Sequence, residues 1–289
     1  MANQPVKYYV VDAFADAAFK GNPAAVCLLG DDVERDEEWL KAVAREFNLS
    51  ETCYLTRIAD SGESANLGFA FDGSLPLKRL VYLCGHATLA SAHVLFTSGL
   101  VEGNTIEFLT LSGILTAKRI PGIKEEEFSI ELDFPAIEVL ECDPLEFPSI
   151  PVTLNGAPMI GVKKMGRSGD IIVELSSGEV VANLQPQFEE IEKCSARGVI
   201  VTGIAPSGSG FDFFSRFFCP KLKINEDPVC GSAHCALVPY WSKKLGKKNF
   251  TAYMASPRGG VLDLDLDEGN NRVRIRGRAI TVMEGSLLA

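Results

Sequence analysis

"EDPVCGSAHCAL" at residues 226–237 brings an acid, a thiol, a hydroxyl and an imidazole close together along the chain. "YLCGHATLASAH" at residues 82–93 has a similar composition. All three histidines of the 289-residue chain, His86, His93 and His234, lie in these two stretches, and each stretch contains a Cys-Gly pair. The two stretches are therefore the starting point for predicting both the fold and the functional residues.

Each Cys-Gly pair precedes a predicted helix. "HATLASAHVLF", after Gly85, is small and apolar on nearly every side, which is typical of a buried helix. "AHCALVPYWSKKLGK", after Gly231, predicts a second helix, and a hairpin pattern follows each one. Cys84 and Gly113, at the first hairpin turn, are 29 residues apart, as are Cys230 and Gly259 at the second. This spacing favours two halves that are built alike.

The rest of the pattern predicts further strands and helices in both halves. Residues 35–49, "RDEEWLKAVAREFNL", have apolar side chains at helical spacing and predict an amphipathic helix between strands. The acidic, proline-bearing stretch at 121–148 predicts the domain boundary. We therefore expect an α/β protein with domains at 1–125 and 126–289, the last residues being able to pack back on the first domain.

The composition excludes several classes of protein. A net charge of −10 argues against nucleic-acid and anionic-membrane partners, which both require a basic surface. The sequence has no signal-peptide pattern and no apolar run of about 18 residues, so we expect a cytoplasmic protein. The eight cysteines are then expected to be reduced thiols, with Cys27, Cys53 and Cys142 acting as small apolar core residues.

The two predicted helix starts suggest a chemistry. A helix N-terminus offers unpaired N–H groups and a partial positive charge, and a preceding glycine allows a ligand oxyanion to approach closely. Two such ends facing across a cleft would hold one small anionic molecule, with polar side chains placed for proton transfer. This arrangement predicts cofactor-free acid/base chemistry.

Individual residues within the two stretches also have simpler explanations. Helix starts lower thiol pKa values, so Cys84 and Cys230 are candidate reactive thiols, although buried cysteines are usually core residues. His86, directly after the glycine, is predicted to be functional, whereas His93 is expected in the core and the role of His234 stays open. Asp227 and Ser232 would also suit as helix caps.

A zinc site is not expected. The residues Cys84, His86, Cys230, His234 and Cys235 provide suitable ligand types. Their spacings, however, match no common zinc-binding pattern.

Six stretches in order resemble the PhzF-like (phenazine biosynthesis PhzC/PhzF-type) proteins, and most closely the plant and animal branch. They cover essentially the whole chain and read "DAFADAAFKGNPAAV", "NLSETCYL", "LCGHATLASAHVL", "FDFFSRFF", "EDPVCGSAHCAL" and "YWSKKLGK". The resemblance implies the diaminopimelate-epimerase-like fold, in which two similar domains each wrap a curved, largely antiparallel sheet around a central helix. It also implies acid/base isomerisation between the two domains without a cofactor, a small anionic metabolite as substrate, and a homodimer.

The resemblance also implies a set of site residues. The family's catalytic carboxylate falls on Glu51, which the sequence alone would place on a surface strand. Burial between two domains would raise the pKa of such a carboxylate, as proton shuttling near neutrality requires. The other catalytic residues that it implies are His86, Asp227 and Ser232, and the implied substrate-binding residues are Asn22, Gly85, Arg216 and Gly231.

The sequence departs from the family in carrying both Cys84 and Cys230. Paired thiols at two helix entrances resemble the two-cysteine racemases and epimerases, in which one thiolate removes the α-proton and the other thiol delivers one. An amino-acid racemase or epimerase is therefore the main alternative function. A catalytically silent ligand-binding or interaction protein is a third.

A second departure is "FDGSLPLKRL" at residues 71–80. The family has a strand similar to R-W-F-T-P-x-x-E-V at this place. Suitable codons for residues 71–80, read one nucleotide earlier, would encode L-R-W-F-T-P-V-E-E-V. We therefore hypothesise a local frame error or an altered splice in the source sequence, which sequencing of the transcript would test.

Overall fold

The computed structural model describes residues 5–30, 35–58, 68–73, 84–110, 113–124, 127–166 and 168–288. The chain divides into two compact units. Unit 1 comprises the residues up to Asp133 together with those from Arg276 onward, and unit 2 comprises Phe134–Ile275. The division thus lies beyond the predicted position at 125/126, and the last residues belong to unit 1. Among the described residues, no helix is long and apolar enough to cross a membrane.

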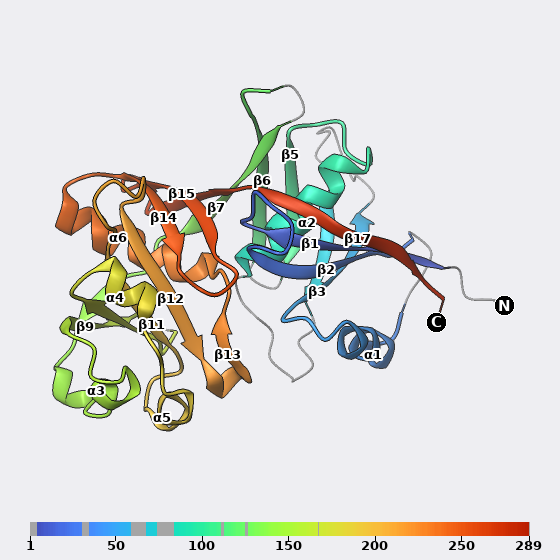
Figure 1. Cartoon of the computed structure of the whole chain (residues 1–289). Coiled ribbons are helices and arrows are strands. Elements are labelled where there is room, and N and C mark those ends of the chain that lie inside the picture. Colours follow the sequence, from blue (N-terminus) through green and yellow to red (C-terminus); the bar gives the residue numbers. More distant parts are fainter. Residues whose placement is uncertain are drawn as a thin grey trace. The chain divides into compact units, whose positions relative to one another are not determined.

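The described residues of unit 1 form two helices and a mixed sheet (Figure 1). The helices are α1 (Glu37–Phe47) and α2 (Gly85–Thr97). The strands are β1 (Val6–Ala13), β2 (Asn22–Leu28), β3 (Thr52–Ile58), β4 (Gly68–Gly73), β5 (Thr105–Thr110), β6 (Gly113–Pro121), β7 (Phe128–Pro135) and β17 (Ala279–Leu287). Both helices occur where the sequence predicts them.

The sheet of unit 1 combines antiparallel and parallel pairs. β1 pairs antiparallel with both β17 and β2, and β2 runs parallel to β3. β3 is antiparallel to β4, β4 is parallel to β5, and β5, β6 and β7 form an antiparallel meander. Because β17 follows the whole of unit 2 in the chain, the first unit is completed by its last strand.

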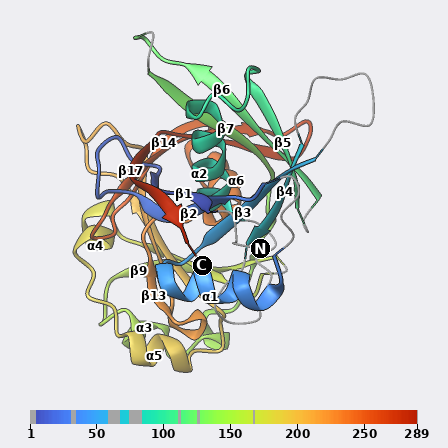
Figure 2. The same ribbon diagram turned by 90° about the vertical axis from the view of Figure 1, so that its right-hand side faces the viewer.

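Helix α2 is the central helix of unit 1. Every residue from Gly85 to Phe96 is buried, and the helix packs against β1, β2, β3, β6 and β17. Figure 2 shows α2 enclosed by these strands. A helix that is apolar on all sides must be buried on all sides, so the prediction of a buried helix is confirmed.

Helix α1 covers the opposite side of the sheet through a small core. Asp36 caps its first turn by accepting a hydrogen bond from the Trp39 N–H at 2.7 Å. Its apolar face joins Val6, Cys27, Leu40, Val43 and Tyr54 in one cluster. The Tyr54 hydroxyl donates to the Leu40 carbonyl at 2.6 Å, which fixes α1 on β3.

Unit 2 contains four α-helices and two short 3₁₀ turns within its described residues. The helices are α3 (Ile150–Thr153), α4 (Gly178–Asn183), α5 (Phe188–Lys193) and α6 (Gly231–Leu245), and the 3₁₀ turns are η1 (Pro144–Glu146) and η2 (Pro220–Leu222). The strands are β8 (Val139–Glu141), β9 (Met159–Met165), β10 (Ile171–Leu175), β11 (Val199–Ile204), β12 (Phe213–Cys219), β13 (Ile224–Asp227), β14 (Asn249–Met254), β15 (Gly260–Asp267) and β16 (Arg272–Gly277).

The strand pairing of unit 2 repeats that of unit 1. β9 is antiparallel to β10, β10 is parallel to β11, and β11 is antiparallel to β12. β12 is parallel to β14, which forms the hairpin with β15. The same alternation runs from β1 to β6, and α6 precedes its hairpin just as α2 precedes β5 and β6. The two halves are therefore built alike, as the repeated spacing predicts.

The structure describes only the first three residues of the stretch 71–80, to which the frame-error hypothesis applies. Strand β4 includes Phe71, Asp72 and Gly73 in its backbone, where Cys53 faces Gly73. Residues 74–83 lie outside the described residues. The frame-error hypothesis therefore stays a prediction.

Candidate active site

The first group of predicted site residues lies at the start of α2. Cys84 is the N-cap residue, with an extended backbone (φ −111°, ψ 96°), and its side chain makes no capping hydrogen bond. The N–H groups of the first turn are consequently not capped by the thiol. Gly85, the first residue of the helix, is buried and leaves the backbone without a side chain at this point.

His86 lies between two possible proton partners. Its Nδ1 atom is 3.6 Å from Cys84 Sγ, and its Nε2 atom is 3.4 Å from Ser50 Oγ. Burial lowers the pKa of His86 to about 4, so the ring is neutral near pH 7. A neutral imidazole carries one N–H and one lone pair, and it can therefore donate to one neighbour while accepting from the other.

Glu51 is buried beside the same helix turn. It is 5% exposed and directly precedes β3, where its carbonyl accepts a hydrogen bond from Ala25 at 3.1 Å. The Cys53 thiol lies 3.7 Å from the Ala87 carbonyl, in the first turn of α2. Burial first, and then the Glu51 charge, raise the pKa of that thiol. Ser50, the residue before Glu51, has its Oγ atom 3.4 Å from His86 Nε2, so this segment lies against the first turn of α2.

Asn22 is buried at the start of β2, directly after a constrained turn. Gly21 has a φ of +62°, and a Cβ atom there would lie 2.1 Å from the Ala13 carbonyl oxygen. Only glycine fits this position. The turn therefore holds Asn22, which is fully buried, in a fixed place within unit 1.

The second group lies at the start of α6 in unit 2. Cys230 is the N-cap residue, and its Sγ atom is 3.3 Å from Ser232 Oγ. Its N–H group donates to Met254 Sδ at 3.0 Å. Burial, followed by the Asp227 charge, raises the pKa of the Cys230 thiol well above its usual value. The predicted lowering of this pKa is wrong, because the loss of hydration outweighs the favourable end of the helix.

Asp227 is the last residue of β13, and the β14–β15 turn holds the connection from Pro228 to α6. Asp227 pairs with Phe217 of β12. Ser256 Oγ donates to the Pro228 carbonyl at 2.8 Å and accepts from the Gly259 N–H at 3.1 Å. The β14–β15 turn therefore fixes the segment between Asp227 and Gly231, where α6 begins.

His234 and His93 have structural roles. His234 is fully buried, and its Nδ1–H donates to the Cys230 carbonyl at 2.8 Å. Its Nε2 atom lies 3.4 Å from Ser215 Oγ. His93 stacks on Phe128 with ring centroids 5.8 Å apart, which confirms its predicted place in the core.

The two helix starts share a pattern of contacts. The residue two positions after each cysteine approaches its sulfur: His86 at 3.6 Å and Ser232 at 3.3 Å. The residue four positions after each cysteine donates to its carbonyl: Thr88 Oγ1 at 2.7 Å and His234 Nδ1 at 2.8 Å. The internal repeat therefore extends to the side chains at the two helix starts.

Arg216 is held by contacts inside unit 2. Its Nε and Nη2 atoms donate to the Glu226 carboxylate at 2.7 and 2.9 Å. Its Nη1 atom donates to the carbonyls of Leu184 at 2.7 Å and Val181 at 3.3 Å, at the end of α4. These bonds give Arg216 a structural role, and its contact with substrate stays a prediction.

The cysteines are reduced, and two of those predicted for the core are fully buried. All eight cysteines are free thiols. Cys27 and Cys53 are fully buried, as expected for core residues, and Cys142 is half-buried with its Sγ atom 3.3 Å from the Val162 carbonyl. In the described part of the chain, no group of three or more His, Cys, Asp or Glu side chains is placed to hold a metal ion.

Known proteins resemble this chain over nearly its whole length. An uncharacterized isomerase of Halalkalibacterium halodurans is 43% identical over 97% of both chains. Phenazine biosynthesis-like domain-containing protein 2 of Mus musculus is 38% identical over 97% of this chain and 98% of its own. The bacterial protein is thus the more similar of the two, so the expected placement in the plant and animal branch gains no support.

A solved structure and a family profile agree with these relatives. The crystal structure of a phenazine biosynthesis PhzF family protein from Enterococcus faecalis superposes with a TM-score of 0.83, at 39% identity, over 98% of this chain and 99% of that one. The family profile described as "Phenazine biosynthesis-like protein" matches residues 11–285. The chain therefore belongs to the PhzC/PhzF family of phenazine biosynthesis-like proteins.

Proposed function

We propose that the protein is a cofactor-independent isomerase that moves a proton on a small carboxylate substrate by acid/base catalysis. The observation that carries the proposal is the buried Glu51, whose neighbour Ser50 lies 3.4 Å from the neutral His86 at the start of α2. The relative from H. halodurans is named an isomerase, which agrees with this class of reaction.

In the proposed reaction, the Glu51 carboxylate takes a proton from a substrate carbon and becomes a carboxylic acid. The electron pair of the broken C–H bond moves into the substrate's conjugated system. Glu51 then returns a proton to another atom of that system, so the net change is a proton shift and the glutamate is regenerated. The first-turn N–H groups of α2 and α6 suit the binding of the substrate's negative charge.

The remaining residues have supporting roles in the proposal. His86 relays a proton between Cys84 and Ser50 or donates to the substrate, since both of its ring nitrogens have a possible partner. Asp227 and Ser232 assist the proton transfer in the proposal. Ser232→Ala tests this role for the serine: we expect a lower rate of proton exchange in a folded protein, and an unchanged rate would contradict it.

The alternative is a two-cysteine racemase or epimerase. It is favoured by the placement of Cys84 and Cys230 at equivalent helix starts, each with a polar group near its sulfur. This mechanism needs a thiolate to remove the α-proton. The raised pKa of Cys230 disfavours the thiolate, so the carboxylate mechanism has the stronger support.

Solvent-deuterium incorporation tests the proposed function. The full chain is incubated in heavy water with a metabolite extract and a panel of amino and hydroxy acids, and mass shifts are followed together with optical rotation. We expect label in a carboxylate compound whose double bond or proton moves. Label with inversion at an α-carbon would favour the racemase. No label in any compound from folded protein would contradict an isomerase function and favour a silent ligand-binding protein.

A further inference from the structure

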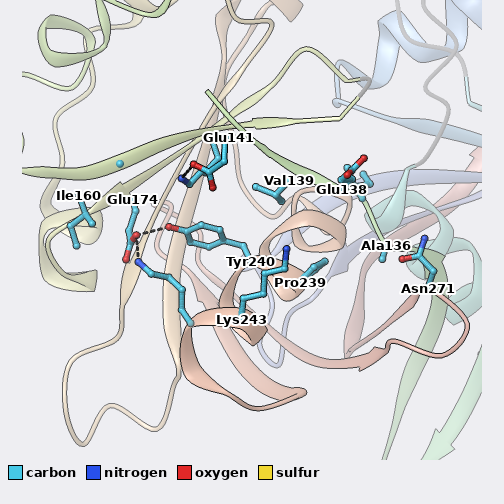
Figure 3. Close-up of a pocket in the computed structure, with 14 residues that line it drawn as sticks. Ala136, Glu138, Val139, Glu141, Ile160, Glu174, Pro239, Tyr240, Lys243 and Asn271 are labelled. Atoms are coloured by element: carbon cyan, nitrogen blue, oxygen red, sulfur yellow. Dashed lines mark hydrogen bonds and ion pairs between the residues drawn. The ribbon is translucent and has the colours of Figure 1, made fainter. Parts of the chain in front are cut away.

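Unit 2 has a pocket of about 690 Å³ between the C-terminal half of α6 and the strands β8, β9 and β10 (Figure 3). Pockets that bind small molecules in proteins have volumes of roughly 300–1,000 Å³. The lining residues include none of the predicted catalytic or substrate-binding residues. The pocket is therefore a second candidate site within unit 2.

A glycine on β9, Gly161, leaves room for the pocket. Gly161 pairs directly with Glu174 of β10, so both residues face the same side of the sheet. A Cβ atom built on Gly161 would meet no atom within 4 Å. The space beside the Glu174 side chain is therefore left open by this glycine.

Helix α6 and the segment before β8 form fixed walls. Pro239, inside α6, has no N–H group to donate to the Cys235 carbonyl. The N–H of Ile137 donates to that carbonyl instead, at 2.8 Å, and the N–H of Ala136 donates to the Asn271 carbonyl at 2.9 Å. The segment that lines the pocket is thereby tied to α6 and to the turn before β16.

A buried ionic group organises the interior of the pocket. Glu174 is 4% exposed, and its Oε2 atom accepts hydrogen bonds from the Tyr240 hydroxyl at 2.5 Å and from Lys244. The Lys244 ammonium also lies over the rings of Tyr240 and Trp241, at 5.4 and 5.6 Å from their centroids. Figure 3 shows the hydrogen bond between Glu174 and Tyr240. The charges of Glu174 and Lys244 therefore compensate each other.

The pocket lining has four further charged residues. Two of them, Lys163 and Glu141, form an ion pair at 2.5 Å. Lys243 and Glu138 make no ion pair within the described ranges, although both line the pocket. Both side chains are exposed and lie apart from each other at the pocket (Figure 3), and a ligand with one negative and one positive group can pair with both. Apolar surface for the rest of such a ligand comes from Ile137, Val139, Ile160 and Pro239.

We propose that this pocket binds a small zwitterion with an apolar side chain, of the α-amino-acid class. The ligand's carboxylate pairs with Lys243, and its ammonium pairs with Glu138. A ligand of this kind compensates both free charges and covers the apolar wall, which a simple anion does not do.

Calorimetric titration of the full chain with three probes tests the charge requirement. L-leucine carries both charges, N-acetyl-L-leucine lacks the ammonium, and 3-methylbutylamine lacks the carboxylate. We expect saturable binding of leucine, with each of the other probes weaker by about tenfold to a hundredfold, because each loses one charge-assisted hydrogen bond. Binding of N-acetyl-L-leucine as tight as that of leucine would overturn the zwitterion proposal, as would the absence of binding by leucine.

Substitutions of pocket residues test whether leucine binds in this pocket. Gly161→Leu fills the space beside Glu174 and should abolish leucine binding, whereas Gly161→Ala should weaken it less. Lys243→Met should weaken it about tenfold or more, while the exposed control Lys118→Met should leave it unchanged. Thermal unfolding of each variant shows that the fold is retained. Leucine binding that persists in Gly161→Leu would place the ligand elsewhere and overturn the proposal.

Discussion

Burial determines the protonation of the histidines in this protein. It lowers the pKa values of His86, His93 and His234 to about 4 each, so all three rings are neutral near pH 7. The neutral His86 ring can therefore donate a hydrogen bond through one nitrogen and accept one through the other. His234 uses its single N–H to bind the Cys230 carbonyl, which fixes its tautomer and leaves it no proton for the substrate.

The histidines make folding stability depend on pH. Above an ordinary pKa of 6.5, each ring is neutral in both the folded and unfolded states. As the pH falls from 6.5 toward 4, the unfolded chain binds protons that the folded chain does not. The free energy of unfolding should therefore fall by roughly 1.4 kcal/mol per pH unit for each histidine within this range.

The variant His93→Phe isolates one of these contributions. Phe retains the stacking on Phe128 but does not titrate. Urea unfolding between pH 4.5 and 7.5 should show a shallower pH dependence than in the wild type, by roughly 1.4 kcal/mol per pH unit. An unchanged slope would contradict the lowered pKa of His93.

At the scale of elements, the turn between β1 and β2 is the most constrained feature near the candidate site. Gly21 and Gly99 both have positive φ values, +62° and +73°. An added Cβ atom would clash with the Ala13 backbone at Gly21, whereas it would meet nothing within 4 Å at Gly99. The two glycines separate the cost of an unfavourable φ from the cost of a backbone clash.

We therefore expect different effects of the same substitution at these two positions. Gly99→Ala should cost about 1 kcal/mol of unfolding free energy, from its positive φ alone. Gly21→Ala should cost more than about 3 kcal/mol or prevent folding, because the β1–β2 turn must shift. Denaturant unfolding measures both values. Equal costs would show that the turn relaxes easily and does not fix Asn22.

At the scale of the molecule, unit 2 is a continuous segment and unit 1 is not. Unit 2 has a core of its own, which gathers buried residues from α3, α4, α5, β9, β10, β11 and β12. Unit 1 needs β17, which pairs with β1 from Val6–Leu287 to Ala13–Ala279. The two units should therefore differ in their ability to fold alone.

Fragments test this difference. Residues 134–275 alone should unfold cooperatively in urea, as followed by circular dichroism. Residues 1–133 should be unfolded or much less stable, because β1 lacks its partner, and joining residues 276–289 by a short linker should restore cooperative unfolding. Cooperative folding of 1–133 without β17 would contradict the division into units.

The sequence predicts much of this fold but only part of the site. The helices after Gly85 and Gly231 follow from local pattern, because apolar periodicity and glycine positions are properties of neighbouring residues. The burial of Glu51 depends on how β3 and α2 pack together, so without the family resemblance it would be assigned to the surface. The raised pKa of Cys230 likewise depends first on burial, to which residues distant in the chain such as Met254 contribute.

The most direct test of the account compares proton exchange in three proteins. With the substrate found by deuterium labelling, initial exchange rates are measured for the wild type, for Glu51→Gln and for the double variant Cys84→Ser/Cys230→Ser. We predict that Glu51→Gln slows exchange by about 10²- to 10⁴-fold, whereas the double variant keeps most of its activity. Full exchange in Glu51→Gln, together with its loss in the double variant, would contradict the carboxylate mechanism and establish the thiols as the proton-transfer groups.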